Sequence, residues 1–184
     1  MGNIKKITIH AGHNKNGKIA CGASDYIDES KEARIITKKV VALLKKKKIT
    51  AYNCTVNNGT SQSDVLKKIC AKCNAKDRQI DVSIHFNACT HSVKDGKTKG
   101  VEVLVINNDG IRKTVGKTIV RNIANIGFTN RGVKENKGLY FLNHTNRPAL
   151  LIEVCFVDDY DDAMLYKKNK DKIAQAIANA IASC

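Results

Sequence analysis

Aromatic residues and proline are scarce in this sequence. The 184 residues include no tryptophan, five tyrosines and four phenylalanines, and none of these alternates with basic residues in the way a base-stacking platform requires. A nucleic-acid-binding module is therefore not favoured. The single proline is Pro148, and no repeat or low-complexity linker interrupts the chain. We therefore expect one globular domain over residues 1–184, with no separate binding domain.

Long apolar runs are also absent. Charged residues interrupt every apolar stretch before it reaches the roughly 20 residues of a membrane-spanning helix, which predicts a soluble protein without membrane insertion. The N-terminal segment MGNIKKITIHAG lacks the apolar stretch of a secretory signal. We expect synthesis in the cytoplasm without a classical signal peptide.

The seven cysteines do not follow a disulfide or zinc-ribbon pattern. An odd number in a chain with room for a large core favours buried, reduced thiols. Cys70 and Cys73 form a lone C-x-x-C on a helical pattern, and no second pair follows as a zinc ribbon requires. We interpret these two residues as small apolar side chains on one helix face.

Acidic residues are few relative to basic ones. There are 17 Asp and Glu against 32 Lys and Arg, which gives a formal net charge of +15. Such a charge predicts an anionic partner. Nucleic acid is the first candidate, although the aromatic pattern argues against it, and anionic polymers of the bacterial cell wall would satisfy the same electrostatics. A solvated lysine-rich surface that aids solubility is the simpler alternative for segments such as LLKKKKI.

The hydrophobic periodicity alternates between strand and helix along most of the chain. Strands are predicted at 4–10, 49–53, 80–89, 100–106, 138–143 and 148–156, and helices at 28–48, 63–75, 110–128 and from 161 onward. This order indicates an α/β fold with a mainly parallel, twisted sheet of about six strands and helices on both faces. In such sheets, functional residues gather beyond the carboxyl ends of the strands.

Polar side chains stand at or near the ends of three predicted strands. His13 follows the first strand after a glycine that permits a tight turn, and His85 lies near the end of the buried stretch IDVSIHFNAC. Glu153 lies among apolar residues in ALLIEVCF, where an ionised carboxylate needs a compensating cation or a raised pKa. Glu29 is the further acidic candidate because it lies on the core-facing side of the first helix.

Two histidines and a carboxylate with an open fourth position are typical of catalytic zinc, and a further carboxylate can serve as general base. The spacing alone is not diagnostic, because no H-E-x-x-H is present. Core histidines with helix-end or surface carboxylates are the structural alternative. Asp25, Asp28 and Glu32 compete with Glu29, and His10 competes as a ligand.

Four segments resemble the zinc-dependent N-acetylmuramoyl-L-alanine amidases of the amidase-3 type, including catalytic domains of clostridial phage endolysins. They are ITIHAGH, YIDES, DVSIHFNA and RPALLIEVCFVDD, in the family's order and over nearly the whole chain. The resemblance implies that His13, Glu29 and His85 bind zinc and that Glu153 is the catalytic acid/base. One departure is His10, where the family commonly has an aspartate, and another is Asn14, where it commonly has glycine.

The resemblance also implies hydrolysis of the amide between N-acetylmuramic acid and L-alanine of peptidoglycan. Asn87 is a candidate to hold substrate or orient a ligand, with a structural hydrogen bond as the alternative. His144 is a candidate to approach the scissile carbonyl, although a surface-loop histidine is the simpler interpretation. Arg131, with Lys134 and Lys137, is a candidate to contact the carboxylates of the stem peptide, and a solvated loop is the alternative.

Two other functions remain open from the sequence. One is a basic nucleic-acid-binding module with structural histidines, and the other is a zinc peptidase that acts within stem peptides. The reduced cysteines and missing signal favour a phage-type lysin, released at lysis to act on the cell wall, over an exported autolysin. We assume a monomer.

Overall fold

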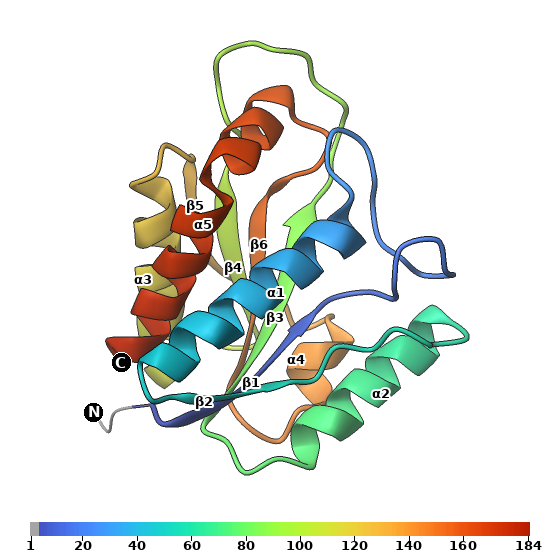
Figure 1. Cartoon of the computed structure of the whole chain (residues 1–184), viewed down its shortest axis with the longest axis vertical. Coiled ribbons are helices and arrows are strands. Elements are labelled where there is room, and N and C mark those ends of the chain that lie inside the picture. Colours follow the sequence, from blue (N-terminus) through green and yellow to red (C-terminus); the bar gives the residue numbers. More distant parts are fainter. Residues whose placement is uncertain (1–3) are drawn as a thin grey trace.

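The computed structural model describes residues 4–184, and a six-stranded sheet forms its centre (Figure 1). The strands are β1 (Lys6–Ala11), β2 (Thr50–Asn53), β3 (Ile80–Asn87), β4 (Val101–Val105), β5 (Asn130–Glu135) and β6 (Ala149–Phe156). They lie in the order β2-β1-β3-β6-β4-β5, and every neighbouring pair is parallel except β4 and β6. The predicted α/β fold with a mainly parallel sheet is confirmed.

Five helices cover the two faces of this sheet. They are α1 (Glu29–Lys46), α2 (Gln62–Asn74), α3 (Gly110–Ala124), α4 (Tyr140–His144) and α5 (Tyr160–Ala182). Helix α1 packs on β1 to β3, α3 packs on β4 and β5, and α5 packs against both helices, so these three cover one face (Figure 1). Helices α2 and α4 contact each other and cover part of the opposite face.

Local capping explains where the helices nearest the strand ends begin. The Asp28 carboxylate accepts a hydrogen bond from the Lys31 backbone N–H at 2.8 Å, so α1 begins immediately after it. Asp159 caps α5 through the Asp162 backbone N–H at 2.9 Å. Side-chain acceptors at this position satisfy backbone donors that the helix itself leaves unpaired.

The two faces of the sheet differ in chemistry. Successive side chains of a strand point to opposite faces, and we call the side under α1, α3 and α5 the packed face. Its strand residues are apolar and fully or almost fully buried: Ile7, Ile9, Ile80, Val82, Ile84, Phe86, Leu150, Ile152 and Val154. We call the other side the polar face, because it carries Thr8, His10, Asp81, Ser83, His85, Glu102 and Glu153.

One predicted strand is wrong and one strand escaped prediction. The segment 138–143 contains the short helix α4, which buries Phe141 and Leu142 against the α2 side of the molecule. A short apolar run fits a strand or a helix equally well, so periodicity did not separate them. Strand β5 is half exposed and has the sequence NRGVKE, which lacks the alternation of a strand. As an edge strand, it needs no continuous apolar side.

The cysteines and the hydropathy agree with the sequence-based expectations. All seven cysteines are unpaired thiols, and four of them, including Cys70 and Cys73, are buried. Among the residues from 4 onward, no helix is both long and apolar enough to span a bilayer.

Candidate metal and catalytic site

The turn after β1 places His13 beside the end of β3. The Gly12 backbone N–H donates to the Ile84 carbonyl at 2.9 Å, so the chain stays paired with β3 as it leaves the strand. His13 then adopts a positive φ of 62°, a conformation that non-glycine residues adopt rarely and that concentrates at functional sites. Asn14, fully buried, holds the rest of the turn by donating its side-chain amide to the Ile19 and Gly59 carbonyls.

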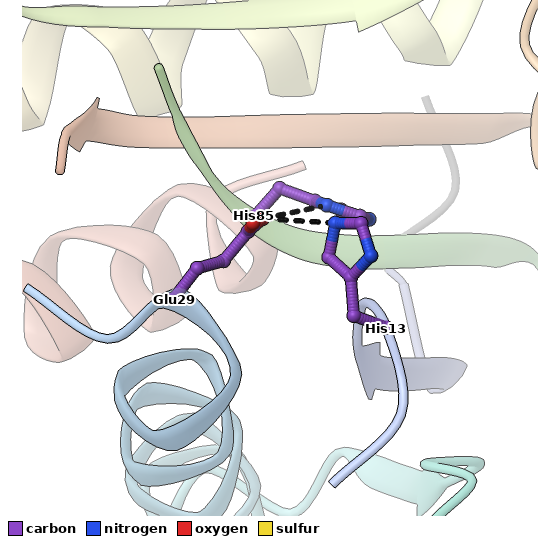
Figure 2. Close-up of side chains that lie close together, drawn as sticks. All are labelled: His13, Glu29 and His85. Carbon is purple, nitrogen blue, oxygen red and sulfur yellow. Dashed lines mark hydrogen bonds and ion pairs between the residues drawn. The ribbon is translucent and has the colours of Figure 1, made fainter. Parts of the chain in front are cut away.

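His13, Glu29 and His85 meet at one point beyond the strand ends (Figure 2). Glu29, the first residue of α1, is 3% exposed, and its Oε1 lies 3.0 Å from His85 Nδ1 and 3.2 Å from His13 Nε2. The Phe86 backbone N–H donates to the same Oε1 at 3.1 Å, and the Ala23 N–H donates to Oε2 at 2.9 Å. The carboxylate is therefore fixed by backbone as well as by the imidazoles.

Two glycines leave the space that this cluster occupies. A Cβ at Gly12 would lie 2.0 Å from His85 Cε1, inside the imidazole ring's van der Waals radius. A Cβ at Gly22, which has a positive φ of 82°, would lie 2.4 Å from Glu29 Oε2. The backbone thus approaches the side chains more closely than any other residue type permits.

The electrostatics of the cluster favour the protonation states that bind metals. Burial by itself raises the pKa of Glu29, but hydrogen bonds from His13 and His85 outweigh it and hold the pKa well below its usual range. Burial lowers the pKa of His85, and the opposing effect of Glu29 only partly offsets this. An ionised carboxylate and neutral imidazole are the forms in which these groups coordinate a metal ion.

The geometry of the cluster fits a tetrahedral metal ion. The ligand atoms of all three residues lie within 4.8 Å of one another. Zn–N and Zn–O distances of roughly 2.0–2.1 Å in a tetrahedron place neighbouring donors roughly 3.3 Å apart, close to the two distances from Glu29 Oε1. Three protein ligands leave one position open, as catalytic zinc sites do.

Glu153 faces the same cavity from the neighbouring strand. It is the ladder partner of His85 across β3 and β6, and both residues line a cavity of about 360 Å³ together with His13 and Tyr140. Burial raises the pKa of Glu153 to about 8, and the charges of Glu29 and Glu102 add to this effect. In the described chain, no side chain or backbone group pairs with its buried Oε2.

Unpaired polar atoms concentrate at this end of the polar face. At the other end, Asp81 is fully satisfied by a forked ion pair with Arg78, with both N–O distances at 2.8 Å. Toward the cavity, Ser83 Oγ and His10 Nε2 are buried without a partner among residues 4–184. Buried polar atoms are nearly always paired. Three of the seven exceptions among residues 4–184, those of His10, Ser83 and Glu153, belong to residues that line this one cavity, which indicates a functional site.

Glu102, which the sequence analysis missed, links several predicted residues. It is the ladder partner of Glu153 across β4 and β6. Asn87 donates to its Oε1 at 2.9 Å, while Arg131 and Lys134 donate to its Oε2 at 2.9 and 2.5 Å. Glu102 is a carboxylate in the apolar strand VEVLV, so the criterion that identified Glu153 also applies to it.

The remaining candidates lie outside the cluster. His10 is buried below it, with Nδ1 3.2 Å from the Ala11 carbonyl. Asp28 caps α1, and Glu32 accepts hydrogen bonds from Tyr166 and Lys170, each at 2.8 Å or less. Asp25 pairs with His91 Nδ1 at 2.7 Å.

His144 is exposed at the end of α4 and does not line the cavity. Its ring stacks on Tyr140 with centroids 3.6 Å apart, and its Nδ1 lies 2.9 Å from the Tyr140 carbonyl. The helix instead presents Tyr140 and Phe141 to the cavity. The sequence analysis predicted a strand over this segment and therefore did not anticipate this placement.

The family model described as N-acetylmuramoyl-L-alanine amidase matches residues 7–183. The chain belongs to this amidase family. The match includes every segment of the His13–Glu29–His85 cluster and the strand of Glu153.

Similar proteins are consistent with membership of the amidase family. The endolysin of Bacillus phage SPP1 is 30% identical over 97% of this chain and 65% of its own length. An uncharacterized protein of Clostridium perfringens is 33% identical over 96% of this chain and 51% of its own length. The chain thus spans only about half to two thirds of these relatives. Among solved structures, the catalytic domain of CD27L endolysin targeting Clostridia difficile has a TM-score of 0.84 at 23% identity, with 97% of both chains covered, which supports the fold.

Proposed function

We propose that this chain is a peptidoglycan hydrolase that cleaves the amide between N-acetylmuramic acid and L-alanine. The observation that carries the proposal is the meeting of His13, Glu29 and His85 at one point beside the cavity of an amidase-family fold. We propose zinc as the ion, held by these three residues. When bound, zinc supplies the Lewis acidity that polarises an amide carbonyl and acidifies water.

Glu153 is the proposed acid/base. As a carboxylate it takes a proton from the attacking water, whose oxygen bonds to the lactyl carbonyl carbon. As the carboxylic acid, which burial and neighbouring charges favour, it returns the proton to the alanine nitrogen while the C–N bond breaks. A proton donor matters here because an unprotonated amine is a poor leaving group.

The backbone and the cavity walls position the other groups. Gly12 and Gly22 leave room for the imidazoles and carboxylate of the cluster, and Asn87 is oriented by Glu102 at the end of β3. Glu153 Oε2 is buried beside the cavity, so bulk water does not reach that oxygen. We propose that Asn87, two residues beyond His85 on β3 and outside the cavity lining, contacts the part of the substrate that extends beyond the cavity. We do not extend this role to His144, because its ring is exposed and stacked outside the cavity.

We propose that residues 1–184 form one catalytic domain that acts on the bacterial wall after release at lysis. The similarity of this chain to the endolysin of Bacillus phage SPP1 supports this proposal. The net charge of +15 suits the anionic wall as the surrounding matrix.

The direct test is digestion of purified Gram-positive peptidoglycan with and without a chelator. New L-alanine amino groups that disappear with chelator and return with added zinc are the expected result. New reducing sugar ends would indicate a glycosidase, and new amino groups on other stem residues would indicate a peptidase. Absence of any cleavage would contradict the proposal and favour a binding module.

A further inference from the structure

Glu102 gathers two cations beside the proposed catalytic glutamate. Burial alone raises the pKa of Glu102, but hydrogen bonds from Lys134 and Arg131 outweigh it and hold the pKa below its usual range. One carboxylate is thus paired with two cations, so Glu102, Arg131 and Lys134 together carry one surplus positive charge. Because both cations are partly exposed, this surplus positive charge is available to an anion that approaches from solvent.

The cations remain accessible while the carboxylate does not. The Arg131 and Lys134 side chains are 33% and 46% exposed, whereas Glu102 is 8% exposed. From these two cations, Glu102 Oε2 accepts only the Nε–H of Arg131 and one N–H of Lys134, while its Oε1 accepts from Asn87. The terminal amino groups of the guanidinium and the other ammonium hydrogens have no hydrogen-bond partner among residues 4–184 and are oriented by the buried carboxylate.

An aromatic ring fixes the guanidinium further. Arg131 Cζ lies 4.9 Å from the centroid of Phe156, and Lys99 Nζ lies 5.7 Å from the same centroid. A guanidinium that is held by both a carboxylate and an aromatic ring loses little further side-chain entropy when it binds a ligand. Phe156 ends β6, the strand that carries Glu153, but neither Phe156 nor the two cations line the cavity, so this arrangement lies beyond the cavity's edge.

The distance of Arg131 and Lys134 from Glu153 indicates which carboxylate of the substrate can reach them. Directly opposed residues of an antiparallel pair point to the same face, so Glu102 and Glu153 face the same side. Strands lie roughly 4.8 Å apart, which places β5 roughly 10 Å from β6, and the Arg131 side chain reaches back toward Glu102. A carboxylate on the residue after L-alanine lies roughly 7 Å from the scissile amide in an extended stem.

We propose that Arg131 and Lys134, held by Glu102, form a subsite for the free carboxylate of the second stem-peptide residue and make the enzyme prefer acidic over amidated stems. This inference rests on the proposed function. It assigns Arg131 and Lys134 to specificity and makes Glu102 a positioning residue that acts through them.

The test compares two soluble substrates that differ in one group. One is a muramoyl dipeptide with a carboxylate on its second residue, and the other carries a carboxamide there. For the zinc-loaded wild type, we expect kcat/KM for the acid to exceed that for the amide about five- to tenfold, as for a charge-assisted contact at a partly exposed site. Lys134→Gln should reduce this ratio, Lys134→Arg should retain it, and Lys134→Glu should invert it.

Matched controls separate this effect from general charge and from folding. Lys117→Gln removes one charge from an exposed position of α3, which packs on the other face of β4 and β5, and should leave the ratio unchanged. Arg131→Gln combined with Glu102→Gln removes a cation without leaving a buried carboxylate underpaired, so the ratio should fall while the melting temperature stays close to wild type. Calorimetric binding of the acidic and amidated muramoyl dipeptides to Glu153→Gln, which should not cleave them, should show the same preference.

The outcomes distinguish this inference from the proposed function. If the wild type cleaves both substrates equally and Lys134→Glu does not change the ratio, the proposed subsite is wrong, while the proposed hydrolase function is unaffected. If the wild type cleaves neither the dipeptides nor polymeric peptidoglycan, the proposed function itself is wrong. If Lys117→Gln shifts the ratio as much as Lys134→Gln does, overall charge explains the preference and the proposed subsite is wrong.

Discussion

On the packed face of the sheet, Ile84 and Ile152 are completely buried among apolar neighbours. One residue further along the same two strands, His85 and Glu153 face the cavity on the other side. The strands are therefore shared, but each face satisfies a different requirement. Burial of apolar surface stabilises the fold, whereas polar atoms buried without partners reduce stability.

This difference indicates where the chain gives up stability for function. At the end of the polar face away from the cavity, the Arg78–Asp81 pair leaves no unpaired charge. Near the cavity, His10 Nε2, Ser83 Oγ and Glu153 Oε2 are all buried and unpaired. Local rules are commonly broken at functional sites and compensated elsewhere, and here the packed face on the opposite side of the same strands provides the compensation.

The largest effect is expected on the polar face, from Glu153→Gln. The amide has a similar shape but cannot accept and return a proton, so turnover should fall about a hundred- to ten-thousand-fold. Zinc content, measured by atomic absorption, should stay at the wild-type level, and the free energy of unfolding should not decrease. A fully active variant would refute the role of Glu153.

The neighbouring change Ile152→Ala should have the opposite consequences. Removing a fully buried side chain costs about 2–5 kcal/mol of unfolding free energy, which denaturant titration measures. Activity per folded molecule should remain within about twofold of wild type, because the side chain points away from the cavity. Loss of turnover at unchanged stability would show that the two faces are not separate in function.

The pH dependence of stability should also reveal the cost of the polar face. The pKa of Glu153 rises from 4.5 to about 8 on folding, so between these values the folded state binds more protons than the unfolded state. The stability of metal-free protein should therefore fall as pH rises through this range, by about 1.4 kcal/mol for each pKa unit of difference. Glu153→Gln should remove that part of the slope, and identical slopes in the two proteins would contradict the raised pKa.

Gly12→Ala tests the close approach of backbone to ligand. The new Cβ would lie 2.0 Å from His85 Cε1, so the imidazole must move, and we expect zinc affinity to fall about ten- to a hundredfold, as when a group that orients a ligand is lost. Competition with a chromophoric chelator measures this change. Gly138→Ala is the matched control, because Gly138 likewise has no positive φ and its Cβ would make only an ordinary contact, 3.4 Å from Asn136 Oδ1. Equal zinc affinity in both variants would argue against the role of Gly12.

The smallest effect is expected for Ser83→Ala. The Ser83 side chain is fully buried, yet its Oγ has no partner in the described structure. Removing it should change the free energy of unfolding by no more than about 0.5 kcal/mol, or stabilise the protein slightly. Val82→Ala, one residue earlier on the packed face, should cost more by thermal unfolding. A larger loss for Ser83→Ala would reveal a hydrogen bond, such as one to buried water.

Sequence patterns predicted the packed face better than the polar face. Alternating apolar residues identified β3, an apolar run identified β6, and the helical recurrence of apolar residues identified α1, because these signals are local. Strand β5 and helix α4 were not recognised, since NRGVKE and GLYFLN owe their conformation to the elements beside them. Tertiary context overrides weak local preference in such segments.

The same distinction applies to the candidate site. His13 and His85 were identifiable because each lies at or just past the end of a buried strand, and the family resemblance separated Glu29 from its acidic neighbours. Glu102 escaped notice because β4 runs antiparallel to β6. A reversed strand brings its early residues, rather than its last ones, to the functional edge of the sheet.

The three proposed ligands come from a turn, a helix start and a strand end, and 56 positions separate Glu29 from His85. An unfolded chain does not hold these groups together, so an ion that requires all three binds the native state alone. Thermodynamic linkage then adds about 4 kcal/mol of stability at a free-ion concentration a thousand times the dissociation constant. On the proposal that this ion is zinc, the melting temperature of the chain should rise with free zinc, and a chelator should lower it to the metal-free value.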